Sequence, residues 1–242
     1  MTETNSGPSA ATKLALVGYG KMGRLIEQLA PEFGFEAALR LDEFNNVDGA
    51  GITPENFAGI GVAVDFSIPP AVAGNVERIA PLGVNIVIGT TGWAGALPRV
   101  RRAVESAKIG LVYGANFSAG VLAFYEIVRA AARTMLAQTD YDAWAYEVHH
   151  RMKKDAPSGT MLRILEAMKE AGYGRNIDVG TNRVGTFPGI HEIGFDSEAD
   201  TITLTHTARG RMGFARGALR AARWVRGKSG LHEFSSIWRE VE

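Results

Sequence analysis

The stretch LALVGYGKMGRLIEQLA, residues 14–30, indicates how the chain begins to fold. Residues 14–17 are a short apolar run of the kind found in strands that are buried on both faces. Gly18, Gly20 and Gly23 follow with the spacing G-x-G-x-x-G, and apolar residues then recur at helical spacing. Residues without side chains let the backbone approach a pyrophosphate at a helix N-terminus. The stretch therefore predicts a dinucleotide site, with an ordinary tight turn between strand and helix as the alternative.

Strands and helices alternate through the rest of the first half of the chain, as expected for a doubly wound α/β domain with a parallel sheet. The predicted strands are Phe35–Leu41, Val62–Phe66, Val84–Ile88 and Leu111–Tyr113, and the predicted helices are Ala71–Ala80 and Leu97–Ala107. Ligands of such sheets bind beyond the carboxyl ends of the strands. Those ends carry the small or polar stretches DFS (65–67), GTTG (89–92) and GANFS (114–118). We expect these stretches to line a cofactor groove.

The sequence pattern changes after Ser118 and predicts a second domain of the α+β class. Residues 141–149 alternate between apolar and polar and predict a half-buried strand, and TITLTHT (201–207) alternates in the same way. The other predicted elements are helices over 121–136, 161–171 and 214–225 and a strand over 179–184. We expect a mainly antiparallel open sheet. The predicted organisation is a disordered tail over 1–12, a dinucleotide-binding domain over 13–117 and 213–242, and a substrate domain over 118–212.

The composition narrows the range of partners. The 242 residues include 26 basic and 26 acidic side chains, and this balance argues against bulk attraction to nucleic acid or to a membrane surface. No apolar run approaches the ~20 residues of a membrane helix, and residues 1–12 do not resemble a signal peptide. The absence of cysteine excludes disulfides and thiolate catalysis and fits a cytoplasmic protein.

The stretch HHRMKKDAPSGT, residues 149–160 and called the basic loop below, concentrates cations in a chain without net charge. Its last residues lead into a helix predicted to start near Met161, where backbone N–H groups and hydroxyls can cradle a carboxylate. Histidine and lysine side chains before that turn supply positive charge and protons. We therefore expect a substrate with carboxylates. The alternative is a solvated turn in which Lys154 and Arg151 pair with Asp155 and Glu147.

Two other kinds of chemistry are not indicated by the sequence. Adjacent histidines in a strand point to opposite faces, and His191, His206 and His232 show no ligand spacing, so we predict no metal site. No strand–G-x-S-x-G–helix elbow is present, which argues against a serine nucleophile.

Four segments together resemble the dihydrodipicolinate reductase family. EVHHRMKKDAPSGT (147–160) is similar to the family signature E-x-HHxxKxDAPSGT, which is long and irregular. DFS, GTTG and ANFS (115–118) match its cofactor-side motifs in order, and HTARGRMGFARGA (206–218) matches a late segment. The resemblance covers nearly the whole chain after the tail.

The resemblance implies reduction of a cyclic imine dicarboxylate to tetrahydrodipicolinate, in lysine and diaminopimelate biosynthesis, with hydride from NADPH or NADH. It also implies a homotetramer built through the sheets of the substrate domain. His149 and Lys153 would be the catalytic acid–base and proton-donor residues. The basic loop and the resemblance together assign the substrate carboxylates to His150, Ser158, Gly159 and Thr160. The expected cofactor-binding residues are Gly18, Tyr19, Gly20, Lys21, Met22, Gly23, Arg40, Asp42, Phe66, Ser67, Gly89, Thr90, Thr91, Gly114, Ala115, Asn116 and Phe117.

Two departures from the family pattern leave alternatives open. The glycine turn is one residue tighter than the G-x-x-G-x-M-G form of many members, which can shift phosphate contacts. Where the second strand ends, Arg40 could attract a 2′-phosphate, whereas Asp42 could bind a free ribose diol. Other hypotheses are a different two-domain nicotinamide oxidoreductase and a cofactor-sensing protein without turnover. The latter predicts loss of the proton donor, yet Lys153 is present.

Overall fold

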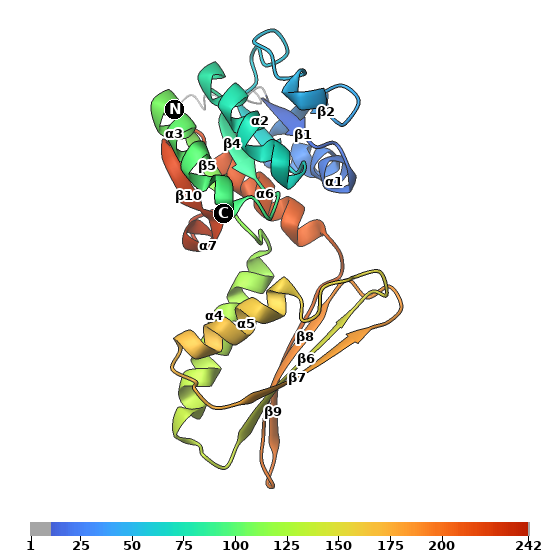
Figure 1. Cartoon of the computed structure of the whole chain (residues 1–242), viewed down its shortest axis with the longest axis vertical. Coiled ribbons are helices and arrows are strands. Elements are labelled where there is room, and N and C mark those ends of the chain that lie inside the picture. Colours follow the sequence, from blue (N-terminus) through green and yellow to red (C-terminus); the bar gives the residue numbers. More distant parts are fainter. Residues whose placement is uncertain (1–10, 242) are drawn as a thin grey trace, which may run out of the picture. The chain divides into compact units, whose positions relative to one another are not determined.

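The computed structural model describes residues 11–241, and the chain divides into two compact units (Figure 1). The first unit is Met1–Phe117 with Phe214–Glu242, and the second is Ser118–Gly213. The predicted domains divide after residues 117 and 212, and the units divide after Phe117 and Gly213. Thr12 already pairs with Phe35 in the first sheet, so the predicted tail is wrong at this residue. Residues 1–10 of that tail lie outside the described part of the chain.

A six-stranded sheet in the order β10-β5-β4-β3-β1-β2 forms the first unit, and each of its strand pairs is parallel. Its strands are β1 (Thr12–Val17), β2 (Phe35–Leu41), β3 (Val62–Asp65), β4 (Asn85–Ile88), β5 (Gly110–Tyr113) and β10 (Gly230–Glu233). The helices are α1 (Lys21–Leu29), α2 (Val72–Ile79), α3 (Leu97–Ala107), α6 (Met212–Trp224) and α7 (Phe234–Ile237). The central strands are almost continuously apolar because helices cover both faces of such sheets. The predicted doubly wound parallel sheet is confirmed.

The second unit is a mixed sheet in the order β7-β6-β8-β9 with two helices. Its elements are α4 (Ala119–Thr134), β6 (Asp142–His149), α5 (Gly159–Glu170), β7 (Ile177–Arg183), β8 (Ile190–Asp196) and β9 (Thr201–Thr207). The β6–β7 pair is parallel and the β6–β8 and β8–β9 pairs are antiparallel, which confirms the predicted mainly antiparallel sheet. Phe124 of α4 packs against His206 of β9.

Two strands were not predicted. β8, IHEIGFD, places His191, Ile193 and Phe195 on the buried face, but Gly194 interrupts the strand-forming pattern. This glycine is required because an added Cβ would lie 2.0 Å from the indole of Trp144. β10 has only four residues and lies at an edge of its sheet, so its sequence carries little apolar signal.

Candidate active site

The glycine turn between β1 and α1 is tight for steric reasons. Gly18 has φ +87°, and a Cβ on it would lie 2.4 Å from the carbonyl oxygen of Phe66. A Cβ on Gly23 would lie 2.9 Å from the Gly18 carbonyl oxygen. Gly20, just before α1, has no atom within 4 Å of a Cβ position. Two glycines therefore serve packing, and the third leaves open space at a helix N-terminus, which suits a phosphate.

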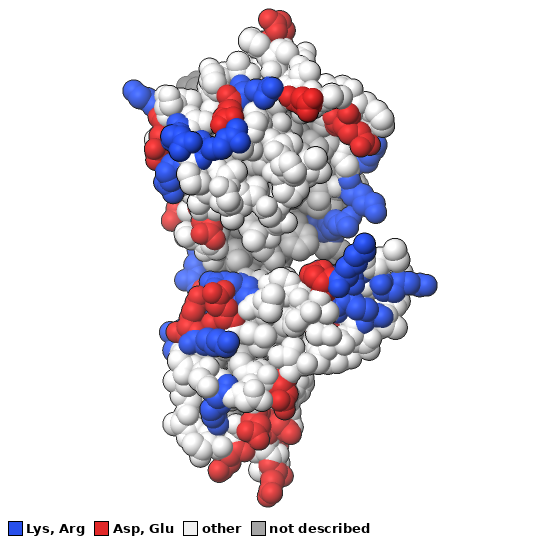
Figure 2. Space-filling view, in the orientation of Figure 1, with Lys and Arg blue, Asp and Glu red and all other residues white. Residues whose placement is uncertain are grey.

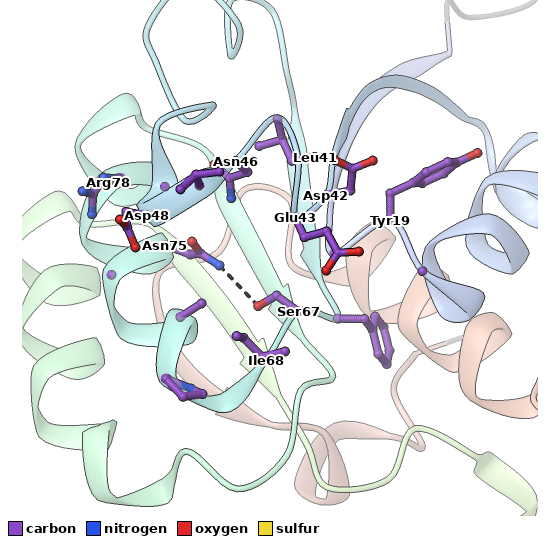
Figure 3. A pocket seen from close by; sticks show the side chains of 18 residues that line it. Tyr19, Leu41, Asp42, Glu43, Asn46, Asp48, Ser67, Ile68, Asn75 and Arg78 are labelled. Carbon is purple, nitrogen blue, oxygen red and sulfur yellow. Dashed lines mark hydrogen bonds between the residues drawn. The ribbon is translucent and has the colours of Figure 1, made fainter.

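A cavity of about 680 Å³ opens beside this turn (Figure 3). Of the predicted cofactor residues it includes Gly18, Tyr19, Gly20, Asp42, Phe66 and Ser67. Prediction missed several other lining residues, among them Glu43, Asn46, Asp48, Asn75 and Arg78. Those from residues 43–48 lie in the connection after β2, which includes the short 3-10 helix Val47–Gly49, and carry no recognisable motif. Asn75 and Arg78 come from α2.

The remaining predicted cofactor residues lie outside this cavity. Lys21, Met22 and Gly23 belong to the first turn of α1, and the stretches Gly89–Thr91 and Gly114–Phe117 follow β4 and β5 in the same sheet. A Cβ on Gly89 would lie 2.1 Å from the Phe66 ring, so this glycine lets the aromatic ring lie across the strand end. Phe117 is buried and stacks on Phe234 with ring centroids 4.5 Å apart, which makes it a core residue of the first unit.

Arg40 and Asp42, the two candidates for reading the ribose, have different surroundings. The Nε atom of Arg40 donates to Glu27 of α1 at 2.8 Å, and Tyr19 also donates to Glu27. The Arg40 and Tyr19 hydrogen bonds lower the pKa of Glu27, and Arg40 is absent from the cavity lining. The Asp42 carboxylate accepts backbone N–H groups of Phe44 and Asn45 at 2.9 and 3.2 Å and lines the cavity.

Arg78 is the basic residue that lines the cavity, opposite Asp42 and beside Asp48 (Figure 3). It is exposed and, within residues 11–241, makes no ion pair closer than 4 Å. Asp42, Glu43 and Asp48 supply three carboxylates to the same cavity. Its rim is therefore more acidic than basic.

Asp65, at the end of β3, is a fully buried carboxylate that sequence reasoning noted only as part of DFS. It accepts the N–H and hydroxyl of Ser67 at 2.8 and 2.6 Å, the amide of Asn75 at 2.9 Å and the hydroxyl of Thr90 at 3.1 Å. Burial raises its pKa, although these hydrogen bonds act in the opposite direction. Asp65 thus ties the loops after β3 and β4 to α2.

The second unit carries its candidate chemistry where β6 ends. Basic side chains gather over the end of the sheet at which β6 and β7 finish, and acidic side chains lie toward the other end (Figure 2). Glu147 and His149 lie on the same face of β6, as the alternation predicted. This polar face is the buried one, however, whereas Trp144 and Tyr146 on the apolar face are half-buried. The basic loop then leads into α5, which begins at Gly159, two residues earlier than predicted.

Glu147 is the centre of the buried polar contacts in this unit. Its Oε1 accepts the Ser158 N–H at 2.9 Å and Arg183 Nη2 at 2.7 Å, and its Oε2 accepts the Ser158 hydroxyl. Burial alone would raise the pKa of Glu147, but the hydrogen bonds from Ser158 and Arg183 hold it below its usual value. The alternative pairing of Arg151 with Glu147 is therefore wrong, because Arg183 of β7 occupies that place.

Two histidines lie beside this carboxylate. His149 Nδ1 and His191 Nε2 are each 3.7 Å from Glu147 Oε2, and their ring centroids are 5.0 Å apart. Burial lowers the pKa of His149. Burial, together with the neighbouring His149, also lowers the pKa of His191 to about 4. His191 was not predicted as a site residue, and the antiparallel register of β6 and β8 places it opposite Glu147.

Lys153 pairs with Asp155 inside the basic loop, with Nζ 2.9 Å from Oδ1. This hydrogen bond lowers the pKa of Asp155, and the backbone amide of Gly159 contributes in the same direction. The alternative in which Lys154 pairs with Asp155 is therefore wrong, because Lys153 occupies that place. Lys153 Nζ and the backbone amide of Gly159, the first residue of α5, therefore both contact the Asp155 carboxylate.

The predicted substrate residues differ in how available they are. The Ser158 hydroxyl caps α5 by accepting the Met161 N–H at 3.1 Å and is buried, so it is already engaged within the protein. Gly159 is exposed, with no atom within 4 Å of a Cβ position, and Thr160 is half-buried at the second residue of the helix. His150 is half-buried at the start of the loop.

Glu147, His149 and His191 also form a possible set of metal ligands, since one atom of each lies within 4.8 Å of the others. Spacing along the sequence did not indicate this set. The Glu147 oxygens already accept hydrogen bonds from Arg183 and Ser158, a cation and a neutral donor that a metal would have to displace. The residues therefore fit an internal ion pair better than a metal centre.

The parallel sheet with its glycine turn and cavity, and the second unit with its basic loop, define a pyridine-nucleotide-dependent oxidoreductase. Residues 12–117 and 120–237 match models of the N-terminus and C-terminus of dihydrodipicolinate reductase. The chain belongs to this family, the NAD(P)H-dependent reductases of lysine and diaminopimelate biosynthesis, which confirms the resemblance. Among residues 11–241, no helix combines the length and the apolar character needed to cross a bilayer.

Relatives and solved structures agree with this assignment. The 4-hydroxy-tetrahydrodipicolinate reductase of Christiangramia forsetii is 31% identical over 239 residues, which cover 94% of this chain and 98% of the relative. The enzyme of the same name from Thiobacillus denitrificans is 34% identical, with the same coverage of both chains. The dipicolinate-bound dihydrodipicolinate reductase from Paenisporosarcina sp. TG-14 shares the fold, with a TM-score of 0.76 at 21% identity, covering 94% of this chain and 99% of that one.

Proposed function

We propose that the first unit binds NADH or NADPH and that the basic loop holds and protonates the cyclic imine dicarboxylate during its reduction to tetrahydrodipicolinate. The cofactor supplies the hydride. A proton must also be delivered to the conjugated imine as its electrons shift, and Lys153 and His149 are the donors that we assign to this step. A related enzyme was solved with dipicolinate, a planar dicarboxylate, which supports a substrate of this class.

One observation carries the substrate assignment. A carboxylate, that of Asp155, already contacts Lys153 Nζ at 2.9 Å and is stabilised by the Gly159 amide. A substrate carboxylate has the same charge and geometry. In place of Asp155 it would meet Lys153, the N–H groups of Gly159 and Thr160 and the Thr160 hydroxyl. We assign His150 to the second carboxylate, and Ser158 to holding the turn through its cap.

The cofactor assignment rests on the cavity of the first unit. Gly20 would face the pyrophosphate at the start of α1, and Asp42 would accept the ribose hydroxyls. Arg40 is tied to Glu27 at an exposed position, so it can release Glu27 to meet a 2′-phosphate at modest cost. We therefore propose that the enzyme uses both cofactors with a modest preference.

We further propose a homotetramer in the cytoplasm, assembled through the sheets of the second unit. The sheet face opposite the buried one carries Trp144 across Gly194 and Tyr146 across Gly180, both partly exposed. Aromatic side chains laid flat on glycines give a surface on which a second sheet can pack. Light scattering of the purified protein should report four copies, and a monomer would contradict this assignment.

The experiment that tests the function is a coupled assay. Dihydrodipicolinate synthase supplies its unstable product in the cuvette, and the absorbance of NADPH or NADH is followed in separate reactions. We expect oxidation of both cofactors that depends on the synthase. Absence of turnover with either cofactor, in protein that binds NADH, would contradict the proposal.

A further inference from the structure

Glu147 is the fully buried acidic residue of the second unit, and no step of the reduction requires it to touch the substrate. Burying a carboxylate is costly unless it is paired and hydrogen-bonded. Three donors meet this one: the Ser158 N–H, the Ser158 hydroxyl and the Arg183 guanidinium. They come from the start of α5 and the end of β7, so one side chain of β6 fixes two other elements.

The first consequence concerns the turn that is proposed to bind a substrate carboxylate. Ser158 immediately precedes Gly159 and Thr160, and both its backbone and its side chain are held by Glu147. The same hydroxyl caps the helix through Met161. The direction of the Gly159 and Thr160 N–H groups at the start of α5 is therefore set by the Glu147 carboxylate.

The second consequence concerns His149. Its Nδ1 is buried and has no hydrogen-bond partner among residues 11–241, and Glu147 Oε2 lies 3.7 Å away. The other charged or titratable groups that act on His149 are Lys153 and Asp155 of the basic loop, Arg183 of β7 and His191 of β8. Burial, Lys153 and Arg183 lower the pKa of His149, while Glu147, followed by Asp155, raises it. Glu147 is thus the main group that favours a proton on this histidine.

We propose that Glu147 is the positioning residue of the substrate site, because its one carboxylate both orients the carboxylate-binding turn through Ser158 and faces the Nδ1 atom of His149. The inference rests on the proposed function of the basic loop. It assigns Glu147 no contact with substrate. Arg183 balances its charge, so the site keeps a negative group beside His149 without leaving a buried charge unpaired.

The test uses the full chain and two variants. Glu147→Gln keeps the shape and can still accept the Ser158 N–H, but it removes the charge. Ser158→Ala keeps Glu147 and Arg183 but removes the hydroxyl that links them to α5. Glu192→Gln, a half-buried glutamate of β8 that contacts Thr205 at 3.4 Å, is the control.

Two readouts separate positioning from simple stability. The first is the dissociation constant of pyridine-2,6-dicarboxylate, measured by calorimetry with NADH present. We expect it to rise about 10-fold in both test variants, the loss typical of a disturbed buried hydrogen bond, with NADH affinity unchanged. The second is the titration of His149 followed by NMR of labelled histidines, where Glu147→Gln should move the midpoint to lower pH.

The outcomes distinguish this inference from the function on which it rests. If the wild-type protein does not bind the dicarboxylate, the proposed function fails, while the titration of His149 still reports on Glu147. If the variants keep wild-type dicarboxylate affinity and Glu147→Gln keeps the His149 midpoint, the inference is overturned. If Glu147→Gln does not fold, unchanged dicarboxylate affinity in Ser158→Ala overturns it.

Discussion

Each of the two units contains a fully buried carboxylate, and the two carboxylates are stabilised in different ways. Asp65 of the first unit receives hydrogen bonds from Ser67, Asn75 and Thr90, which are all neutral. Glu147 of the second unit receives hydrogen bonds from Ser158 and from the cationic Arg183. The pKa of Asp65 is raised by burial, whereas the pKa of Glu147 is held down despite burial.

The difference fits the ligand that each unit is proposed to bind. The first unit orders backbone turns and small residues around a cavity, and a buried acid with neutral partners holds those turns without adding cations. The second unit is proposed to bind a small dicarboxylate with its cations, and there the buried acid has a cationic partner, Arg183, and lies beside His149. The comparison predicts that charge changes in the second unit affect the rate of the reaction. Charge changes in the first unit should instead affect its stability and its relative affinity for NADH and NADPH.

The largest effect is expected for Lys153→Ala. Loss of a general acid should lower kcat by about 10²–10⁴-fold, with cofactor affinity nearly unchanged. Lys154→Ala is the matched control, since Lys154 is an exposed neighbour. Steady-state kinetics with saturating cofactor measures the effect. An unchanged kcat in folded Lys153→Ala protein would show that this lysine is not the proton donor. It would also contradict the expectation that charge changes in the second unit affect the chemical step.

The two buried carboxylates should affect stability with opposite pH dependence. The raised pKa of Asp65 gives a stabilising contribution at low pH that is lost as pH rises above 3.8 through the folded-state pKa. The lowered pKa of Glu147 gives a contribution that is present above 4.5 and is lost as pH falls through the folded-state pKa. Relative to Asp65→Asn the wild type should therefore lose stability with rising pH, and relative to Glu147→Gln it should gain.

Denaturant unfolding between pH 3 and 8 measures these differences, which we expect to reach about 1–3 kcal/mol for a disturbed buried polar group. The decisive result is the sign with which each stability difference between wild type and variant changes as pH rises. A wild type that gains stability with rising pH relative to Asp65→Asn would show that the neutral donors outweigh burial and lower the pKa of Asp65.

Most of the fold could be predicted because its signals are local. The apolar strands, the glycine turn and the alternating β6 and β9 are visible within windows of several residues. The basic loop was visible for the same reason. Arg183 and His191 were not, because they reach Glu147 only through the pairing of β6 with β7 and β8, 36 and 44 positions along the chain. The alternation of β6 placed Glu147 on the same face as His149, but it gave no sign that this polar face would be the buried one.

Thr160→Val tests whether the start of α5 recognises a carboxylate. The substitution keeps the shape of the side chain and removes one hydroxyl donor. We expect affinity for pyridine-2,6-dicarboxylate to fall by about 1–3 kcal/mol, the range for a hydrogen bond to a charged group. Thr134→Val, at the end of α4, is the control. Inhibition by the dicarboxylate that is not competitive with substrate would place its site elsewhere and would weaken the contrast between the units.

The smallest effects are expected where the first unit reads the ribose. Asp42→Ala should weaken NADH, because a diol acceptor is lost, and should relieve repulsion of a 2′-phosphate. Arg40→Ala should weaken NADPH by only about 2–5-fold, since an exposed guanidinium that must first leave Glu27 is worth little. Arg78→Ala is the informative comparison, because Arg78 lines the cavity and Arg40 does not.

Dissociation constants of both cofactors on all three variants decide between these residues. If Arg40→Ala alone shifts the ratio of NADPH to NADH affinity, Arg40 of β2 binds the 2′-phosphate after releasing Glu27. If Arg78→Ala shifts it instead, the guanidinium on α2 does so, and the Arg40–Glu27 pair only joins β2 to α1. If none of the three changes the ratio, the ribose is read by backbone groups, and the first unit then recognises its ligand almost without charged side chains, in sharper contrast to the second unit.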